Sequence, residues 1–212
     1  MENQQNLKEF TAEAKNILIV CKDNRSDSLA TAISIAKYIE KTTEKTPKLV
    51  YKGDLSVVDP YLLSLYKVHE NIEPRRLSLS LNYKESSIEK LNWHKDEEKG
   101  VIVFDIFPVE KNFDSSRISH SFSGGEYDVI VAVGLSSLEE LDDIYFKNKE
   151  VFEAAKIVNI DTSGNNQQFG DLNIIDTAIE SLSGLLFAKF SEWKYIPDKD
   201  VVKSLLVGIA QS

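Results

Sequence analysis

The sequence predicts an α/β domain on a mostly parallel, doubly wound sheet that carries an inserted β-hairpin region. Uninterrupted apolar runs of strand length, such as residues 17–21 and 129–133, alternate with amphipathic segments of helix length. Continuous apolar runs are typical of strands covered on both faces, and alternating strand and helix units favour parallel pairing. In the middle of the chain, Leu77, Leu79 and Leu81 alternate strictly with serines, which predicts a half-buried strand of another kind.

The elements can be placed in order along the chain. Residues 1–15 form a polar arm or a short helix, and residues 16–212 form a single domain with a β-rich insertion at 75–123. Strands are expected at 17–21, 48–51, 128–133, 156–160 and 172–175, and helices at 29–39, 60–68, 136–145, 178–193 and 198–210. Proline after Asp59 and the serines at 136–137 are typical of helix starts.

The insertion predicts an antiparallel hairpin. Residues 88–94 and 101–107 are strand candidates, and a charged turn at 95–100 that ends in glycine lies between them. The glycine-rich stretch at 123–125 returns the chain to the domain, where the alternation of strands and helices resumes.

Composition excludes several classes of function. The net charge is −9 and the densest basic cluster is Arg75–Arg76, so we expect no strong nucleic-acid interface. A single cysteine rules out an internal disulfide and fits a reducing compartment. The polar start resembles no signal peptide, and no apolar run approaches the ~18 residues of a membrane span. The sequence therefore predicts a cytoplasmic protein without membrane contact.

Ligands of open parallel sheets bind beyond the carboxyl ends of the strands. The first such loop, residues 22–28, leads into a helix whose free N–H groups favour anions. Lys22, Arg25, Ser26 and Ser28 are its candidates for binding a phosphate group or a nucleotide. The alternative is that Ser26, Asp27 or Ser28 caps the helix while Lys22 and Arg25 are solvated.

The other two loops carry less chemistry. Residues 134–137 read as a turn and a cap, without a histidine or a nucleophile elbow to activate the serines. Residues 161–168 begin with Asp161, the best single carboxylate for a metal ion or a substrate hydroxyl. One carboxylate rarely holds a divalent ion, so hydrogen bonding within the loop is the alternative.

Four segments together resemble DHH-type phosphoesterases, which include RecJ-like exonucleases and oligoribonucleases that act on phosphoadenosine phosphate. They are residues 16–39, residues 127–141, Val158 to Asp161 with Phe169 to Asp176, and residues 205–209. The third segment is the most specific, because it reads like the family signature N-I-D-H-H followed by F-G-D-x-N-x-x-D. The resemblance implies that this chain has the fold of that family's N-terminal α/β domain. It covers most of the chain except the insertion at 75–123.

The resemblance also implies a degenerate metal site. Family members hold two Mn²⁺ or Mg²⁺ ions on a His-x-x-x-Asp-x-Asp motif, an isolated Asp and an Asp-His-His motif. The corresponding positions in this chain are Lys22, Ser26, Ser28, Gly134, Asp161, Thr162 and Ser163. Only Asp161 keeps the family's residue, although a one-position slip would return Asp27 to a ligand position.

Two functions follow from this comparison. The chain is either a non-catalytic binding or interaction module without a cofactor, or an active phosphoesterase with Mn²⁺ or Mg²⁺ on Asp27 and Asp161. The family's smaller substrate-binding domain is expected to be absent, since the chain ends where it would be joined. The insertion then stands in for that domain, forms a homodimer or partner surface, or packs on the main sheet.

Overall fold

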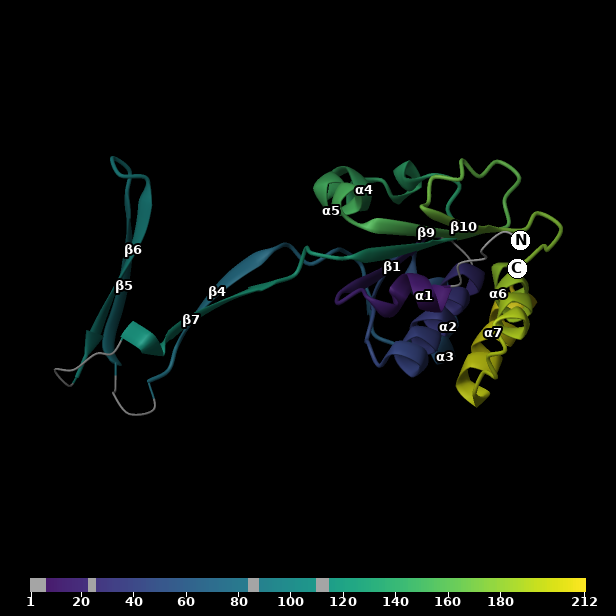
Figure 1. Ribbon diagram of the computed structural model, residues 1–212, viewed down its shortest axis with the longest axis horizontal. Coiled ribbons are helices and arrows are strands. Elements are labelled where there is room, and N and C mark those ends of the chain that lie inside the picture. Colours follow the sequence, from purple (N-terminus) through teal and green to yellow (C-terminus); the bar gives the residue numbers. More distant parts are fainter. Residues whose placement is uncertain (1–6, 23–25, 84–87, 110–114) are drawn as a thin grey trace. The chain divides into compact units, whose positions relative to one another are not determined.

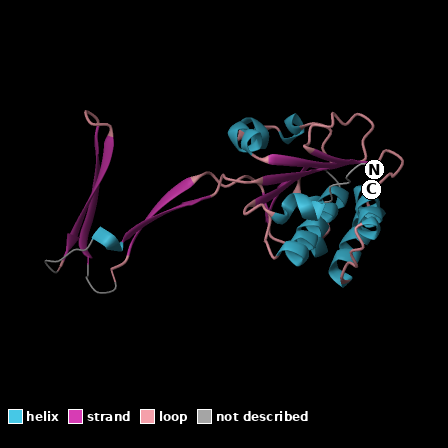
Figure 2. Cartoon of the chain, viewed as in Figure 1, coloured by secondary structure: helices cyan, strands magenta, loops and turns pink. Residues whose placement is uncertain are grey.

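The computed structural model describes residues 7–22, 26–83, 88–109 and 115–212. The chain divides into two compact units, which we call the main unit (residues 1–74 and 125–212) and the insertion unit (residues 75–124). The main unit holds a sheet with helices, whereas strands make up most of the described insertion unit (Figures 1 and 2). In the part of the chain that the structure describes, no helix is long and apolar enough to cross a membrane.

A six-stranded sheet forms the centre of the main unit. Its order is β10–β9–β8–β1–β2–β3, and neighbouring strands pair in parallel. The strands are β1 (Ile17–Lys22), β2 (Lys48–Lys52), β3 (Val68–His69), β8 (Val129–Val133), β9 (Lys156–Asp161) and β10 (Leu172–Ile175). The predicted parallel sheet is confirmed. The strand order reverses between β1 and β8, and open α/β sheets bind ligands at such a switch point.

Helices cover both faces of this sheet. They are α1 (Leu7–Ala12), α2 (Ser26–Thr43), α3 (Pro60–Leu65), α4 (Asp143–Phe146), α5 (Lys149–Ala154), α6 (Leu182–Glu192) and α7 (Lys199–Ala210). Figure 1 shows α4 and α5 on one face and the other helices on the opposite face. Ile19 of β1 packs into the core beneath α2 and α6, whereas Leu18 and Val20 pack into the core beneath α4 and α5. The apolar run of β1 is continuous because successive side chains enter different cores.

Three predicted helices have different boundaries in the structure. The helix expected at 60–68 ends at Leu65, because Val68–His69 pairs with β2 as strand β3. The helix expected at 136–145 is interrupted by Asp142, whose φ of 49° separates the 3-10 turn η3 (Leu138–Leu141) from α4. The helix expected from residue 178 begins at Leu182, because the Ser181 hydroxyl accepts a hydrogen bond from the N–H of Gly184 and caps it there.

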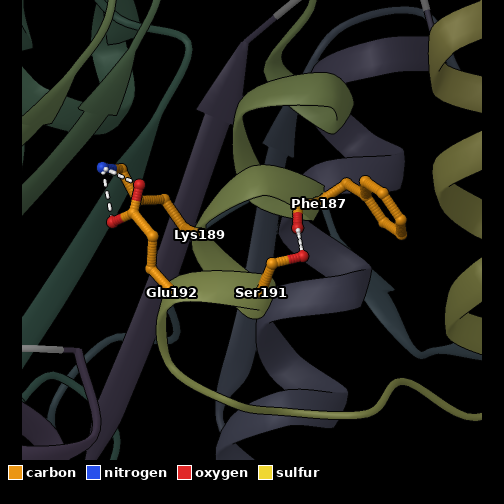
Figure 3. A network of polar contacts seen from close by, with 4 residues as sticks. All are labelled: Phe187, Lys189, Ser191 and Glu192. Carbon is orange, nitrogen blue, oxygen red and sulfur yellow. Dashed lines mark hydrogen bonds and ion pairs between the residues drawn. The ribbon is translucent and has the colours of Figure 1, made fainter.

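Helix α6 has one face in the core and another toward solvent. Phe190 is buried in the core, whereas Phe187 is half exposed. Figure 3 shows two polar contacts on different sides of the helix: Lys189 forms an ion pair with Glu192, and the Ser191 hydroxyl donates to the carbonyl of Phe187. Exposed pairs of this kind contribute little to stability, so α6 is held in place by its buried side.

The insertion unit consists of two antiparallel two-stranded ladders. Strand β4 (Arg76–Leu81) pairs with β7 (Ile118–Ser123), and the hairpin of β5 (Ile88–Asp96) and β6 (Val101–Pro108) confirms the predicted hairpin. The expectation that the first of these strands is half-buried is wrong, because Leu77 and Leu79 are 53% and 55% exposed. Strand β4 pairs only with β7 among the described strands, so it takes no place in the covered central sheet.

Asp128, which precedes β8, forms hydrogen bonds with the residues that precede β1. Its carboxylate oxygen Oδ2 accepts hydrogen bonds from the backbone N–H groups of Lys15 and Asn16, at 2.7 and 2.8 Å. The bond from Asn16 is the main reason that the pKa of Asp128 lies below its usual value. A carboxyl group with a lowered pKa stabilises the fold above its unfolded pKa of 3.8.

We therefore expect the contribution of Asp128 to be lost as the pH falls through its folded pKa, which lies below 3.8. At neutral pH, Asp128→Asn should lower the free energy of unfolding by less than about 1 kcal/mol, because the group is exposed and screened. Urea unfolding of both proteins from neutral to acidic pH measures the difference. A difference that stays constant over this range would contradict the assigned role of the carboxylate.

Candidate functional site

The ends of three neighbouring strands define the candidate site. Cys21 of β1 pairs with Val133 of β8, which pairs with Ile160 of β9. The next residues along the three strands are Lys22, Gly134 and Asp161, so these positions are neighbours at one edge of the sheet. The N–H of Gly134 donates to the carbonyl of Ile160 at 2.9 Å, which continues the pairing by one residue. The structure therefore brings together three of the positions that the sequence singled out, at the switch point of the sheet.

The first turn of α2 adds three more positions to this edge. Ser26, Asp27 and Ser28 are 1%, 5% and 1% exposed, and Arg25 lies outside the described residues. The Ser26 hydroxyl accepts a hydrogen bond from the N–H of Asp59 at 3.4 Å. The Ser28 hydroxyl is buried without a hydrogen-bond partner among the described residues. Both serines that were candidates for anion binding are thus covered by protein.

Asp27 caps a helix, but not the helix that contains it. Its carboxylate oxygens accept hydrogen bonds from the backbone N–H groups of Leu182 and Ser183, at 2.8 and 2.9 Å. These amides belong to the first turn of α6, where N–H groups lack partners within the helix. The expectation that Asp27 or a neighbouring serine caps α2 is therefore wrong for Asp27, which lies within that helix and stabilises the start of α6.

A close approach of α7 encloses this carboxylate. A methyl group on Gly208 would lie 2.0 Å from the Ser183 hydroxyl oxygen and 2.8 Å from Asp27 Oδ1, so only glycine fits there. The hydroxyls of Thr31 and Ser183 are 3.0 Å apart and share a hydrogen bond. A buried polar cluster therefore joins α2, α6 and α7, and sequence reasoning missed Ser183 and Gly208 because no local pattern marks them.

The carboxylate of Asp161 is also occupied by its own chain. Its Oδ1 accepts a hydrogen bond from the N–H of Thr162 at 2.8 Å, and its Oδ2 accepts one from the side-chain amide of Asn166 at 2.7 Å. The Ser136 hydroxyl donates to that of Ser163 at 3.2 Å, which joins loops 134–137 and 161–168. Hydrogen bonding within the loop, one of the two expectations for Asp161, is thus observed.

Charged side chains at the rim pair with one another. Lys22 forms an ion pair with Asp142 at 3.7 Å. Glu140 accepts a hydrogen bond from the N–H of Ser136. The pKa of Glu139 is lowered because the carboxylate accepts hydrogen bonds from its own backbone N–H and from the Ser137 hydroxyl. These contacts hold the loop after β8 in place and present no aligned set of ligands.

A leucine lies beside Gly134, the position at which the family carries an aspartate. A Cβ atom built on Gly134 would be 2.7 Å from Leu182 Cδ1 and 3.3 Å from Ser28 Cβ, and the φ of Gly134 is +67°. Leu182 is 7% exposed, so its side chain has little room to turn away. Hydrocarbon therefore lies where a side chain at position 134 would begin.

The residues present do not fit a two-metal centre. Asp161 is the one carboxylate at an aligned ligand position and Asp27 lies one residue away from another, and each uses both of its oxygens within the chain. Across residues 7–22, 26–83, 88–109 and 115–212, no three His, Cys, Asp or Glu side chains gather as a metal site would require. Divalent metal sites need several oxygen or imidazole ligands that point at one place.

Comparison with known proteins places the fold. No protein-family model matches the chain, and no curated protein matches its sequence. An exopolyphosphatase-related protein from Bacteroides fragilis matches in structure with a TM-score of 0.57. The chain therefore shares the fold of this exopolyphosphatase-related neighbour. The two proteins are 14% identical over 93% of this chain and 46% of the neighbour, so this chain spans less than half of the neighbour's length.

Proposed function

We propose that this chain is a degenerate DHH-type phosphoesterase-like domain that performs no metal-dependent hydrolysis and acts as a binding or interaction module. The observation that carries the proposal is the double hydrogen bond of Asp27 to the start of α6. Each oxygen of this carboxylate already accepts a backbone amide of α6 and the group is 5% exposed, so a metal ion would have to compete with these hydrogen bonds in a covered site. The phosphoesterase-like fold supports the DHH-type origin.

The other positions support the same reading. Two-metal hydrolysis needs ions that activate water and neutralise the leaving phosphate. Lys22 carries a positive charge where the family carries a neutral ligand, so it opposes the entry of a cation. Leu182 places hydrocarbon beside Gly134, and Asp161 is bonded within its own loop. Restoring one ligand would leave the remaining defects in place.

Calorimetric titration with Mn²⁺, together with assays on a phosphodiester and a short oligonucleotide, tests this proposal. We expect no binding heat at micromolar affinity and no turnover above the buffer rate. Asp161→Asn should behave as the unmodified protein does in both measurements. Asp176→Asn is a matched control, because Asp176 accepts one hydrogen bond in an exposed turn.

A Mn²⁺-dependent activity that Asp161→Asn abolishes and Asp176→Asn retains would overturn the proposal. It would favour the alternative, an active phosphoesterase with an altered site on Asp27 and Asp161. An activity that both variants retain and that co-purifies with the chain through two further columns would also overturn the proposal, whereas an activity that separates from the chain belongs to a contaminating enzyme.

A further inference from the structure

The insertion unit exposes an unusual amount of apolar surface. Of the eighteen large apolar side chains that are exposed among the described residues, eleven belong to this unit, and their exposed fractions run from 44% to 66%. None of the unit's residues with a described burial is buried. The described part of the unit therefore lacks a core of its own. A pair of strands without a covered face is at best marginally stable in water, so this unit is expected to need a covering surface.

The ladder of β4 and β7 separates its side chains by face. Leu77, Leu79 and Leu81 point to one face together with Ile118, which pairs with Leu81. The opposite face carries serines, since Ser78 and Ser80 pair with Ser121 and Ser119. One face of this ribbon is therefore mostly apolar, with His120 opposite Leu79, and the other carries serines and Arg76.

The hairpin of β5 and β6 has an apolar face as well. Leu91 pairs with Ile106 and Trp93 pairs with Phe104, so four large side chains share one face. The apolar faces of both ladders line a groove of about 850 Å³. Their side chains remain about half exposed, so the ladders do not fill this groove themselves.

Charge distinguishes the insertion unit from the rest of the chain. Residues 75–124 contain eight Lys or Arg and eight Asp or Glu, so their formal net charge is zero. The whole net charge of −9 is therefore carried by the main unit. A neutral surface with both signs of charge meets its own copy without repulsion. A basic partner or an anionic membrane would instead be expected to select an unbalanced charge.

We propose that the insertion unit is a homodimerisation surface whose apolar faces are covered by the insertion unit of a second copy. Two ribbons that each have an apolar face pack as stacked sheets. Seven of the exposed residues lie on the two apolar faces: Leu77, Leu79, Leu91, Trp93, Ile102, Phe104 and Ile118. At roughly 100 Å² exposed per side chain they offer about 700 Å² per copy, close to the ~800 Å² per partner of a standard interface. The proposal does not depend on the loss of the metal site.

Sedimentation of the full chain over about 1 to 100 µM tests the dimer. We expect twice the mass of the chain, and a dimer that 1 M NaCl does not dissociate because apolar contacts hold it. Leu79→Lys places a charge on the apolar face and should weaken the dimer at least tenfold. Ser121→Lys adds the same charge on the serine face, where it is exposed, and should leave the dimer intact.

Hydrogen exchange of the unmodified chain gives a second measurement that needs no variant. Amide protection in β4 to β7 should rise with protein concentration, while that of the central sheet stays constant. A monomer at 100 µM with constant exchange in the insertion unit would overturn the proposal. A monomer whose insertion unit binds neutral lipid vesicles would also overturn it, in favour of a membrane surface.

Discussion

Asp27→Asn is expected to lower the free energy of unfolding of the main unit by about 3 kcal/mol. The aspartate offers one oxygen to each of two amides, those of Leu182 and Ser183. Asparagine has the same shape but offers one oxygen and one NH₂ group, so a donor must face a donor in a buried site. Urea unfolding followed by far-ultraviolet circular dichroism measures the loss, and hydrogen exchange should locate it at the start of α6.

Asp176→Asn provides the matched comparison for this substitution. The Asp176 carboxylate accepts one hydrogen bond, from the N–H of Ala178, which the oxygen of asparagine can also accept. We expect a change within about 0.5 kcal/mol for that variant. If Asp27→Asn were equally mild, Asp27 would not be the cap of α6, and its carboxylate would be available for other ligands.

Gly134→Asp, which returns the family's residue to its position, is expected to destabilise the protein by about 3 kcal/mol and to create no Mn²⁺ site. Position 134 has a φ of +67°, a region that non-glycine residues adopt only with strain. The new Cβ would also lie 2.7 Å from Leu182 Cδ1, and the carboxylate would enter a covered site. Urea unfolding and calorimetric titration with Mn²⁺ measure the two effects.

Two companion variants separate the causes. Gly134→Ala carries the backbone strain and the new Cβ without the charge, so its difference from Gly134→Asp isolates the cost of the carboxylate. In a Leu182→Ala background, Gly134→Asp should cost at least about 1 kcal/mol less, since the overlapping side chain is gone. Mn²⁺ binding by Gly134→Asp alone would show that Leu182 does not obstruct the position.

Much of the sheet could be predicted because its strands are covered on both faces. The apolar run of β1 has its physical cause in the alternation of Ile19 and Val20 between two cores. Strands of this kind need no partner to be recognised in a sequence. The parallel pairing of the strands followed from their alternation with helices, since parallel neighbours need crossover connections, whereas the strand order was not predicted.

The candidate site was predicted in position but not in structure. The loops after β1, β8 and β9 meet at one edge because the sheet is parallel, which the sequence indicates. The partner of Asp27 lies 155 residues away, and no local rule pairs a carboxylate with a helix start at that distance. The same holds for Leu182 beside Gly134. The exposed leucines of β4 escaped prediction because an alternating pattern indicates two faces but not what covers either of them.

The cap that Asp27 provides for α6 has a consequence for how the domain can evolve. Under the proposed DHH-type origin, a metal site that used Asp27 would first release two amides at the start of a helix that packs on α2 and α7. The intermediate sequence would be less stable and not yet catalytic. On that proposal the path to a metal site crosses a sequence of lower stability, unless another side chain first accepts the hydrogen bonds from Leu182 and Ser183.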